Sequence, residues 1–222
     1  CGPLSIAQVG REFTRYVMGN WHPLTMLSYS ADLSMFGMEP GGMHGTNLLL
    51  HLVNALLVAL FIRRLTGDPL VAALTMLLWA VHPLRVESVA WVSGRKDLLM
   101  TLFGLLTLLL WLQWKATGRL RFFLASLIAF VLACFSKGMA VSLVPCLWLV
   151  DRSAGRPLWT RNALLEKLPF VVVAIVIGLV TLDAQSMVMK AFAQHMDPLD
   201  RFHVGPANLL VYSVQQVLPI GL

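Results

Sequence analysis

The chain has 222 residues, of which 58% are hydrophobic and only 13% are charged, and its mean hydropathy is +0.75. Soluble domains carry roughly 25% charged residues, so this composition excludes an ordinary soluble enzyme and predicts a polytopic membrane protein. The net charge of +6 mostly reflects basic loops beside apolar segments, and no nucleic-acid partner is expected. The expected fold class is all-α, because an open sheet edge in lipid would leave backbone groups unpaired.

The first 45 residues are amphipathic and contain no long apolar run. The stretch GNWHPLTMLSYSADLSMFGMEPGGMHGTN predicts short helices joined by a Pro-Gly-Gly turn at residues 40–42. We expect residues 1–45 to form an outer-face region that lies on the membrane surface without crossing it. His22 precedes Pro23, which disfavours helical geometry at His22, so its ring either closes a turn at the interface or belongs to a site.

The remainder, residues 46–222, is expected to be a transmembrane helical bundle of about six spans plus the start of another. The predicted spans are 46–65, 69–83, 97–114, 120–136, 139–150 and 168–184, with a further span opening near residue 206. Two of them, 69–83 and 139–150, are short. Fifteen residues cover roughly 22 Å, whereas the hydrocarbon layer is about 30 Å thick, so each must extend into its flanks, lean on neighbours or stop part-way.

A polar stripe marks the start of the first span. Its members are spaced three, four and three residues apart and share one helix face: His44, Asn47, His51 and Asn54. Such groups inside an apolar helix make interhelical hydrogen bonds or face a watery cavity, and both alternatives stay open. No carboxylate or cysteine joins the stripe, so metal binding is disfavoured there, and no residue of this chain is assigned as a metal ligand.

The segment HPLRVESVAWVSGRKDLLM, residues 82–100, keeps apolar residues among its charges. Val86, Val89, Ala90 and Val92 fit one face of a helix that lies flat on the bundle, and Ser93-Gly94 is expected to end it. Asp97 then begins the next span, where the helix dipole favours an acidic residue.

Arg95 and Lys96 stand at the start of that span, beside free backbone N–H groups that suit an anion such as phosphate. The alternative is that these two cations meet lipid headgroups while Arg85 and Glu87 pair locally. Lys137, in CFSKGMAV, either reaches the headgroups on its own or joins the same group of cations.

The orientation follows from the short loops. Loops 63–68, 115–121 and 151–167 together hold nine Lys or Arg and three Asp or Glu, and their basic character predicts a cytoplasmic position. Lys137 then lies on the outer side together with Arg95 and Lys96. Several cations at one outer face suit a lipid-linked phosphate.

Three motifs occur in a recognisable order: GNWHPLTMLSYSADLSMFGMEPGGMHGTNLLLHLVNALL, then AVHPLRVESVAWVSGRKDLLMTLFGLLTL, then CFSKGMAVSLVPCLWLVD. Over roughly residues 19 to 151 the chain resembles the membrane half of bacterial tetratricopeptide-repeat membrane proteins. These are similar to the eukaryotic transmembrane and tetratricopeptide-repeat O-mannosyltransferases. The resemblance implies a multi-pass protein of the C-type glycosyltransferase fold, in a bacterial inner membrane.

In that family a sugar passes from a polyprenyl-phosphate carrier to a protein hydroxyl on the outer side of the membrane, and the resemblance to the eukaryotic relatives implies mannose. The implied partners are membrane lipids, the lipid-linked sugar donor and a protein acceptor, and dependence on a divalent metal is left open. The residues that fall on family motif positions are His82, Glu87, Arg95, Asp97 and Lys137. Basic residues near span ends hold the carrier phosphate, which implies that role for Arg95, Lys96 and Lys137.

The catalytic base of the family comes from an acidic pair that is expected upstream of residue 1. The chain is therefore expected to be a fragment, lacking that pair and the tetratricopeptide repeats, and to be inactive by itself. Glu87 and Asp97 are the acids nearest the cations, and we expect them to orient the basic residues. The alternative function is a non-catalytic membrane scaffold that anchors tetratricopeptide repeats.

Overall fold

The computed structural model describes the chain except for residues 1, 3–4, 18 and 194–222. Each regular element in the described part is a helix, which confirms the all-α expectation. The α-helices are α1 (Ile6–Thr14), α2 (Pro23–Phe36), α3 (Pro40–Thr66), α4 (Pro69–Val81), α5 (Pro83–Ala90), α6 (Arg95–Thr117), α7 (Leu120–Ser136), α8 (Leu143–Ser153) and α9 (Arg161–Ala193). Two 3₁₀ turns connect them, η1 (Val92–Gly94) before α6 and η2 (Gly138–Ser142) before α8.

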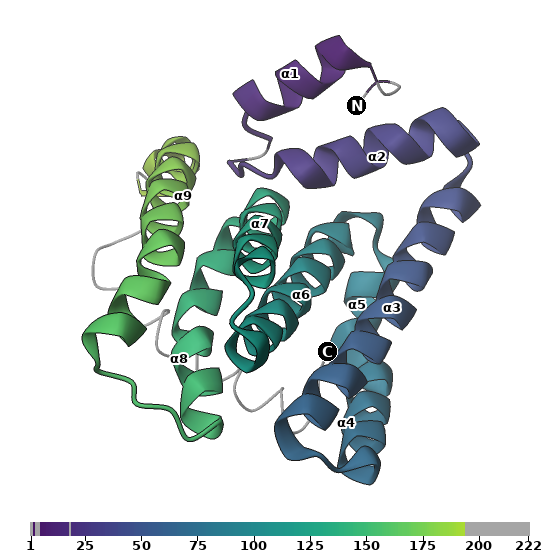
Figure 1. Cartoon of the computed structure of the whole chain (residues 1–222). Coiled ribbons are helices and arrows are strands. Elements are labelled where there is room, and N and C mark those ends of the chain that lie inside the picture. Colours follow the sequence, from purple (N-terminus) through teal and green to yellow (C-terminus); the bar gives the residue numbers. More distant parts are fainter. Residues whose placement is uncertain (1, 3–4, 18, 194–222) are drawn as a thin grey trace.

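Helices α1 and α2 lie across one end of the bundle, as Figure 1 shows. Thr25 Oγ1 donates a hydrogen bond to the carbonyl oxygen of Ser136 at 2.9 Å, and Tyr29 Oη donates to that of Val92 at 2.7 Å. Helix α2 therefore covers the end at which α6 begins and α7 ends.

The break between α2 and α3 differs from the predicted Pro-Gly-Gly turn. Gly37 caps the end of α2, directly after Phe36, and its φ of 64° is a left-handed value that favours glycine. Helix α3 begins three residues later, at Pro40. Proline is well suited to the first position of a helix. The N–H group that it lacks would have no hydrogen-bond partner inside the helix at that position, so nothing is lost. The turn prediction was therefore wrong, and α3 starts several residues before the predicted span.

Three segments are long and apolar enough to cross a membrane: Pro40–Thr66, Val92–Thr117 and Arg161–Ser186. They contain the predicted spans 46–65, 97–114 and 168–184. The protein is thus an integral membrane protein by the length and composition of its helices. The segment near residue 206 lies outside the described residues.

The shorter predicted spans take other forms. Helices α4 and α5 meet at a bend of 60° and together could form one broken span or a re-entrant loop. Leu120–Ser136 is a shorter apolar helix, as predicted for 120–136. The predicted 139–150 is divided between η2 and α8.

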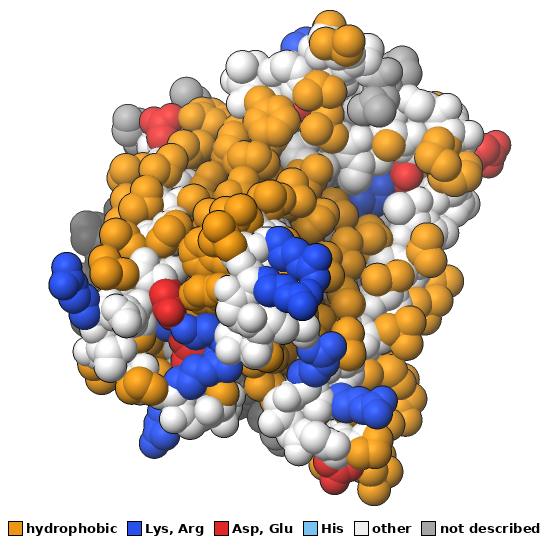
Figure 2. Space-filling model, in the orientation of Figure 1, with side chains coloured by type: hydrophobic (Ala, Val, Ile, Leu, Met, Phe, Trp, Pro, Cys, Tyr) orange, Lys and Arg blue, Asp and Glu red, His pale blue; other side chains and the backbone are white. Residues whose placement is uncertain are grey.

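The core lies between α6, α7, α8 and α9. Trp111, Phe130 and Phe170 are fully buried, and the Trp111 and Phe170 rings meet edge to face with centroids 5.5 Å apart. Large apolar side chains elsewhere on α3, α4 and α9 are exposed, as expected for surfaces that face lipid. Figure 2 shows hydrophobic side chains over much of one face.

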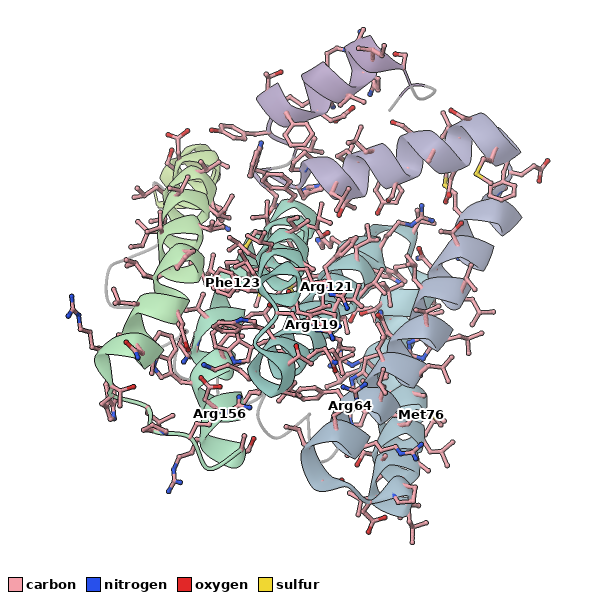
Figure 3. All side chains as sticks on the ribbon, viewed as in Figure 1. Arg64, Met76, Arg119, Arg121, Phe123 and Arg156 are labelled. Atoms are coloured by element: carbon pink, nitrogen blue, oxygen red, sulfur yellow. The ribbon has the colours of Figure 1, made fainter. Side chains whose placement is uncertain are left out.

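The opposite end of the bundle from α2 is basic. Arg64 Nη1 donates to Gln113 Oε1 at 2.7 Å, which joins the ends of α3 and α6, and Lys115 forms an ion pair with Glu166, which joins the end of α6 to the beginning of α9. Lys and Arg side chains gather over the lower half of the face in Figure 2, and Figure 3 labels four of the arginines: Arg64, Arg119, Arg121 and Arg156.

Candidate functional site

The three sequence motifs meet at one small cavity of about 30 Å³. It is lined by residues from the loop before α2, the first turn of α6, the end of α7 with η2, and α9: Asn20, Trp21, His22, Lys96, Ser136, Lys137, Gly138 and Thr181. The lining thus includes both Lys96 and Lys137, two of the three cations assigned to a phosphate site. The volume is that of about one water molecule.

The end of α7 determines the position of Lys137. It has extended backbone angles, φ −157° and ψ 127°, which stop the helix, and its N–H bonds to the carbonyl oxygen of Ala133. Its ammonium group forms an ion pair with the carboxylate of Asp97 in the first turn of α6. Both side chains are about one quarter exposed, so the pair remains in reach of solvent. Asp97 thereby holds Lys137 at the cavity.

His22 borders the cavity from the other side. Its backbone is non-helical, as the following proline predicts, and it stands directly before the first residue of α2. Burial lowers the pKa of this imidazole, and the positive charge of Lys96 lowers it further. His22 is therefore neutral at pH 7, and the positive charge of the cavity comes from the two lysines.

Arg95 does not line this cavity. Its side chain is fully buried and points toward α2 and α3. Nη1 lies 2.5 Å from Asp32 Oδ2, Nε donates to Asn47 Oδ1 at 2.8 Å, and Nη2 donates to the carbonyl oxygen of Met43 at 2.7 Å. The guanidinium also lies over the Tyr29 ring, 4.9 Å from its centre. Arg95 therefore connects three helices, although it is the sequence neighbour of Lys96.

The polar stripe of α3 makes interhelical hydrogen bonds. Asn47 Nδ2 donates to the carbonyl oxygen of Trp91 at 3.1 Å, and Asn54 Nδ2 donates to that of Leu98 at 2.9 Å. His51 Nε2 lies 3.1 Å from the carbonyl oxygen of Ala80. His44, the fourth predicted member, is exposed at the start of α3.

His82 and Glu87 lie on α5, away from the lysines. His82 precedes Pro83, and its Nδ1 accepts a hydrogen bond from the N–H of Leu84 at 3.3 Å, which caps the helix. The Glu87 side chain is exposed and makes no ion pair within the described part of the chain. Of the two acids expected to orient the cations, Asp97 contacts one of them.

Sequence reasoning missed Asp32, the partner of Arg95. It stands in SADLSM, inside the first motif, and a lone carboxylate in an apolar helix was the available signal, because such a group needs a partner. It also missed a second buried pair, in which Lys167 Nζ lies 2.5 Å from Asp151 Oδ2 while Trp111 Nε1 donates to Asp151 Oδ1 at 3.0 Å. Among the described residues, no group of three His, Cys, Asp or Glu side chains is placed to hold a metal ion.

Comparison with known proteins gives the family. The model of the dolichyl-phosphate-mannose-protein mannosyltransferase family matches residues 23–182, which is most of the chain and contains the lysines, Asp97 and Arg95. The chain belongs to this family. No solved structure matches it significantly.

Individual relatives agree with this assignment. The chain is 38% identical over 111 residues to protein O-mannosyl-transferase Tmtc2 of Drosophila melanogaster, covering 48% of this chain and 12% of the relative. It is 38% identical over 104 residues to human protein O-mannosyl-transferase TMTC4, covering 40% of this chain and 14% of the relative. The chain thus spans about one eighth of the length of these curated relatives.

Proposed function

We propose that the full protein is a membrane glycosyltransferase that transfers a sugar, mannose by analogy with its relatives, from a polyprenyl-phosphate carrier to a protein hydroxyl. We place this reaction on the side of the membrane that α2 and the lysine cavity face, and we take that side to be the outer one. The relatives carry the name protein O-mannosyl-transferase, which supports the sugar and the protein acceptor.

The observation that carries the proposal is the meeting of three separate motifs at one cavity. Lys96 and Lys137 are 41 positions apart in the sequence, yet both line it. Two cations that merely reached lipid headgroups independently would have no need to share a cavity. A phosphate, in contrast, is stabilised by several charged donors at once.

The cavity in this structure is smaller than a phosphate group, so binding requires a side chain to move. The pair between Lys137 and Asp97 is the natural point of opening, because both groups are partly exposed. In the resting site the Asp97 carboxylate occupies the position of an anion beside Lys137. We propose that the carrier phosphate replaces it there and also contacts Lys96.

This arrangement serves the chemistry of the leaving group. In the proposed transfer the acceptor oxygen bonds to the anomeric carbon while the bond from that carbon to the phosphate oxygen breaks. Negative charge then grows on the departing phosphate, and two fixed ammonium groups stabilise it. The acceptor hydroxyl must lose its proton to a base. We assign no residue of the described part to that base.

The test is binding of the polyprenyl-phosphate carrier, without sugar, to the full-length protein in detergent. Lys96→Met and Lys137→Met should each weaken binding at least tenfold, because a charge-assisted contact contributes about 1.5–3 kcal/mol. Asp97→Asn should tighten binding, since it frees Lys137. Arg119→Met, which removes an exposed cation, is the matched control.

Unchanged carrier binding in both lysine variants would remove the phosphate-site proposal. If the full-length protein also bound no carrier at all, the scaffold function would be the better explanation. A weaker-binding Asp97→Asn variant would show instead that the carboxylate takes part in the site.

A further inference from the structure

A second hollow, which is mainly apolar but bordered by Arg85 and two histidines, lies at the bend between α4 and α5, and the proposed transfer does not use it. One cavity of about 390 Å³ is lined by Thr75, Leu78, Trp79, His82, Leu84 and Arg85. An adjoining cavity of about 220 Å³ is lined by His51, Ala80, Arg85, Val89 and Ala90. Arg85 borders both cavities. Each is several times larger than the lysine cavity.

Arg85 brings an uncompensated positive charge to this hollow. Its guanidinium carbon lies 5.2 Å from the centre of the Trp79 ring, and no carboxylate pairs with it in the described part of the chain. The nearest acid in sequence, Glu87, is exposed. A guanidinium has five N–H donors and favours carboxylate or phosphate oxygens.

His51 contributes a hydrogen-bond acceptor to this hollow, and no donor in the described part of the chain pairs with it. The side chain is 7% exposed, and its ring stacks on Trp79 with centroids 5.2 Å apart. Nε2 faces the carbonyl oxygen of Ala80, which can only accept, so Nε2 carries the hydrogen and Nδ1 of the neutral ring is an acceptor. Nδ1 has no hydrogen-bond partner among the described residues, although buried polar groups are normally paired.

The surroundings of the hollow are those of a lipid-facing site. Leu78 lines the larger cavity and is 70% exposed, and the neighbouring Leu74 and Leu77 of α4 are exposed as well. These three leucines form an exposed apolar surface beside the hollow. The ligand should therefore carry both a charged head and an apolar tail.

We propose that this hollow binds the headgroup of an anionic, hydroxyl-bearing phospholipid, of the phosphoglycerol type. The phosphate lies against Arg85 in the larger cavity. His51 Nδ1 is covered in this structure, so a small shift of its surroundings lets a glycerol hydroxyl in the smaller cavity donate to it, while the acyl chains follow the leucines of α4. This assignment is independent of the proposed transfer and of its carrier.

The experiment measures the lipid retained by the full-length protein in native mass spectrometry after reconstitution with defined lipids. Phosphatidylglycerol offers the charge and the hydroxyls, whereas phosphatidylcholine carries no net charge and no hydroxyl. The wild-type protein should retain phosphatidylglycerol at least tenfold more than phosphatidylcholine. Arg85→Gln should abolish that preference, and His51→Phe should reduce it severalfold.

The matched control is Arg121→Gln, which removes the same charge from an exposed residue at the basic end and should leave the preference intact. Thr75→Trp provides a second variant, because it fills the larger cavity and leaves Arg85 in place. It should lower retention even if Arg85→Gln fails to fold. Equal retention of the two lipids, or no loss in Thr75→Trp, would overturn the proposal. Displacement of the lipid by soluble glycerol 3-phosphate would show that the site takes the free phosphate ester, and would overturn the lipid assignment.

Discussion

Asp32 of α2 and Arg95 in the first turn of α6 form a buried ion pair, with Oδ2 and Nη1 2.5 Å apart and side chains only 7% and 0% exposed. Asp32 Oδ2 and Arg95 Nη1 are close enough for an ion pair, but their angles do not fit a hydrogen bond. The guanidinium donates hydrogen bonds to Asn47 and Met43 of α3, and a longer one of 3.4 Å to the carbonyl oxygen of Ser28 in α2. Arg95 thereby links α2 to α3 and α6, in addition to the hydrogen bonds that Thr25 and Tyr29 make to the end of α7 and the start of η1.

We expect Arg95→Met to destabilise the protein by about 3–5 kcal/mol, because it leaves the Asp32 carboxylate buried without its partner. Thermal unfolding in detergent measures this. The double variant Asp32→Leu with Arg95→Met should recover part of the loss, since both charges are then gone. Arg121→Met, at an exposed position, should change the unfolding temperature little. An Arg95→Met protein as stable as the wild type would contradict a structural role.

Gly94 permits the close approach of α5 to the start of α6. A Cβ atom at Gly94 would lie 2.5 Å from the backbone oxygen of Ser88, a distance that only a shift of the backbone can relieve. Gly94→Ala should therefore cost about 1–3 kcal/mol. Gly45→Ala in α3 is the control, because a Cβ there meets nothing within 4 Å. Equal unfolding temperatures for the two variants would argue against this packing.

His22 should make stability depend on pH. Because burial and then Lys96 lower its pKa in the folded state, the unfolded chain takes up a proton first, at about pH 6.5. The stabilisation from neutral His22 is thus complete above about pH 6.5 and is lost as the pH falls through the lowered folded pKa. His22→Gln should flatten the curve of unfolding temperature against pH in this window. If both proteins show the same slope, other groups govern it.

The orientation can be tested at two exposed serines on opposite ends of the bundle, Ser93 and Ser153. In intact cells a membrane-impermeant maleimide should label Ser93→Cys and not Ser153→Cys, because the loop after α8 is short and basic. The partly buried Cys146 is first replaced by Ala. Labelling of Ser153→Cys alone would reverse the topology and place the lysine cavity on the inner side.

The central, apolar parts of the three long helices could be predicted from the sequence, because hydropathy and length are enough to recognise a segment that can span a membrane. Helix ends were harder. All three residues of the tripeptide at 40–42, one proline and two glycines, are of types that usually break helices, yet Pro40 starts α3 and Gly37 supplies the positive φ that ends α2. Local composition does not say which of several nearby glycines and prolines takes which position.

The candidate site could be predicted in part. Lys96 and Lys137 line one cavity, since both stand where a helix begins or ends on the same side of the bundle, and their role at a phosphate stays a prediction. The opposite directions of Arg95 and Lys96 could not be predicted. Adjacent residues on a helix point about 100° apart, and only the position of Asp32 on a separate helix decides which one turns inward.

The buried pair of Asp151 and Lys167 bears on how the protein enters its membrane. Lys167 is fully buried in the first turns of α9, and its ammonium group contacts the carboxylate of the preceding helix. A lysine buried at the end of a span is costly without a partner, whereas a lysine already paired with a carboxylate of its neighbour is much less so. We therefore expect α8 and α9 to leave the insertion machinery as a paired hairpin. If translation is stalled after α8 and before Lys167 is synthesised, α8 should remain at the insertion machinery. It should move into the lipid only in chains long enough to include Lys167.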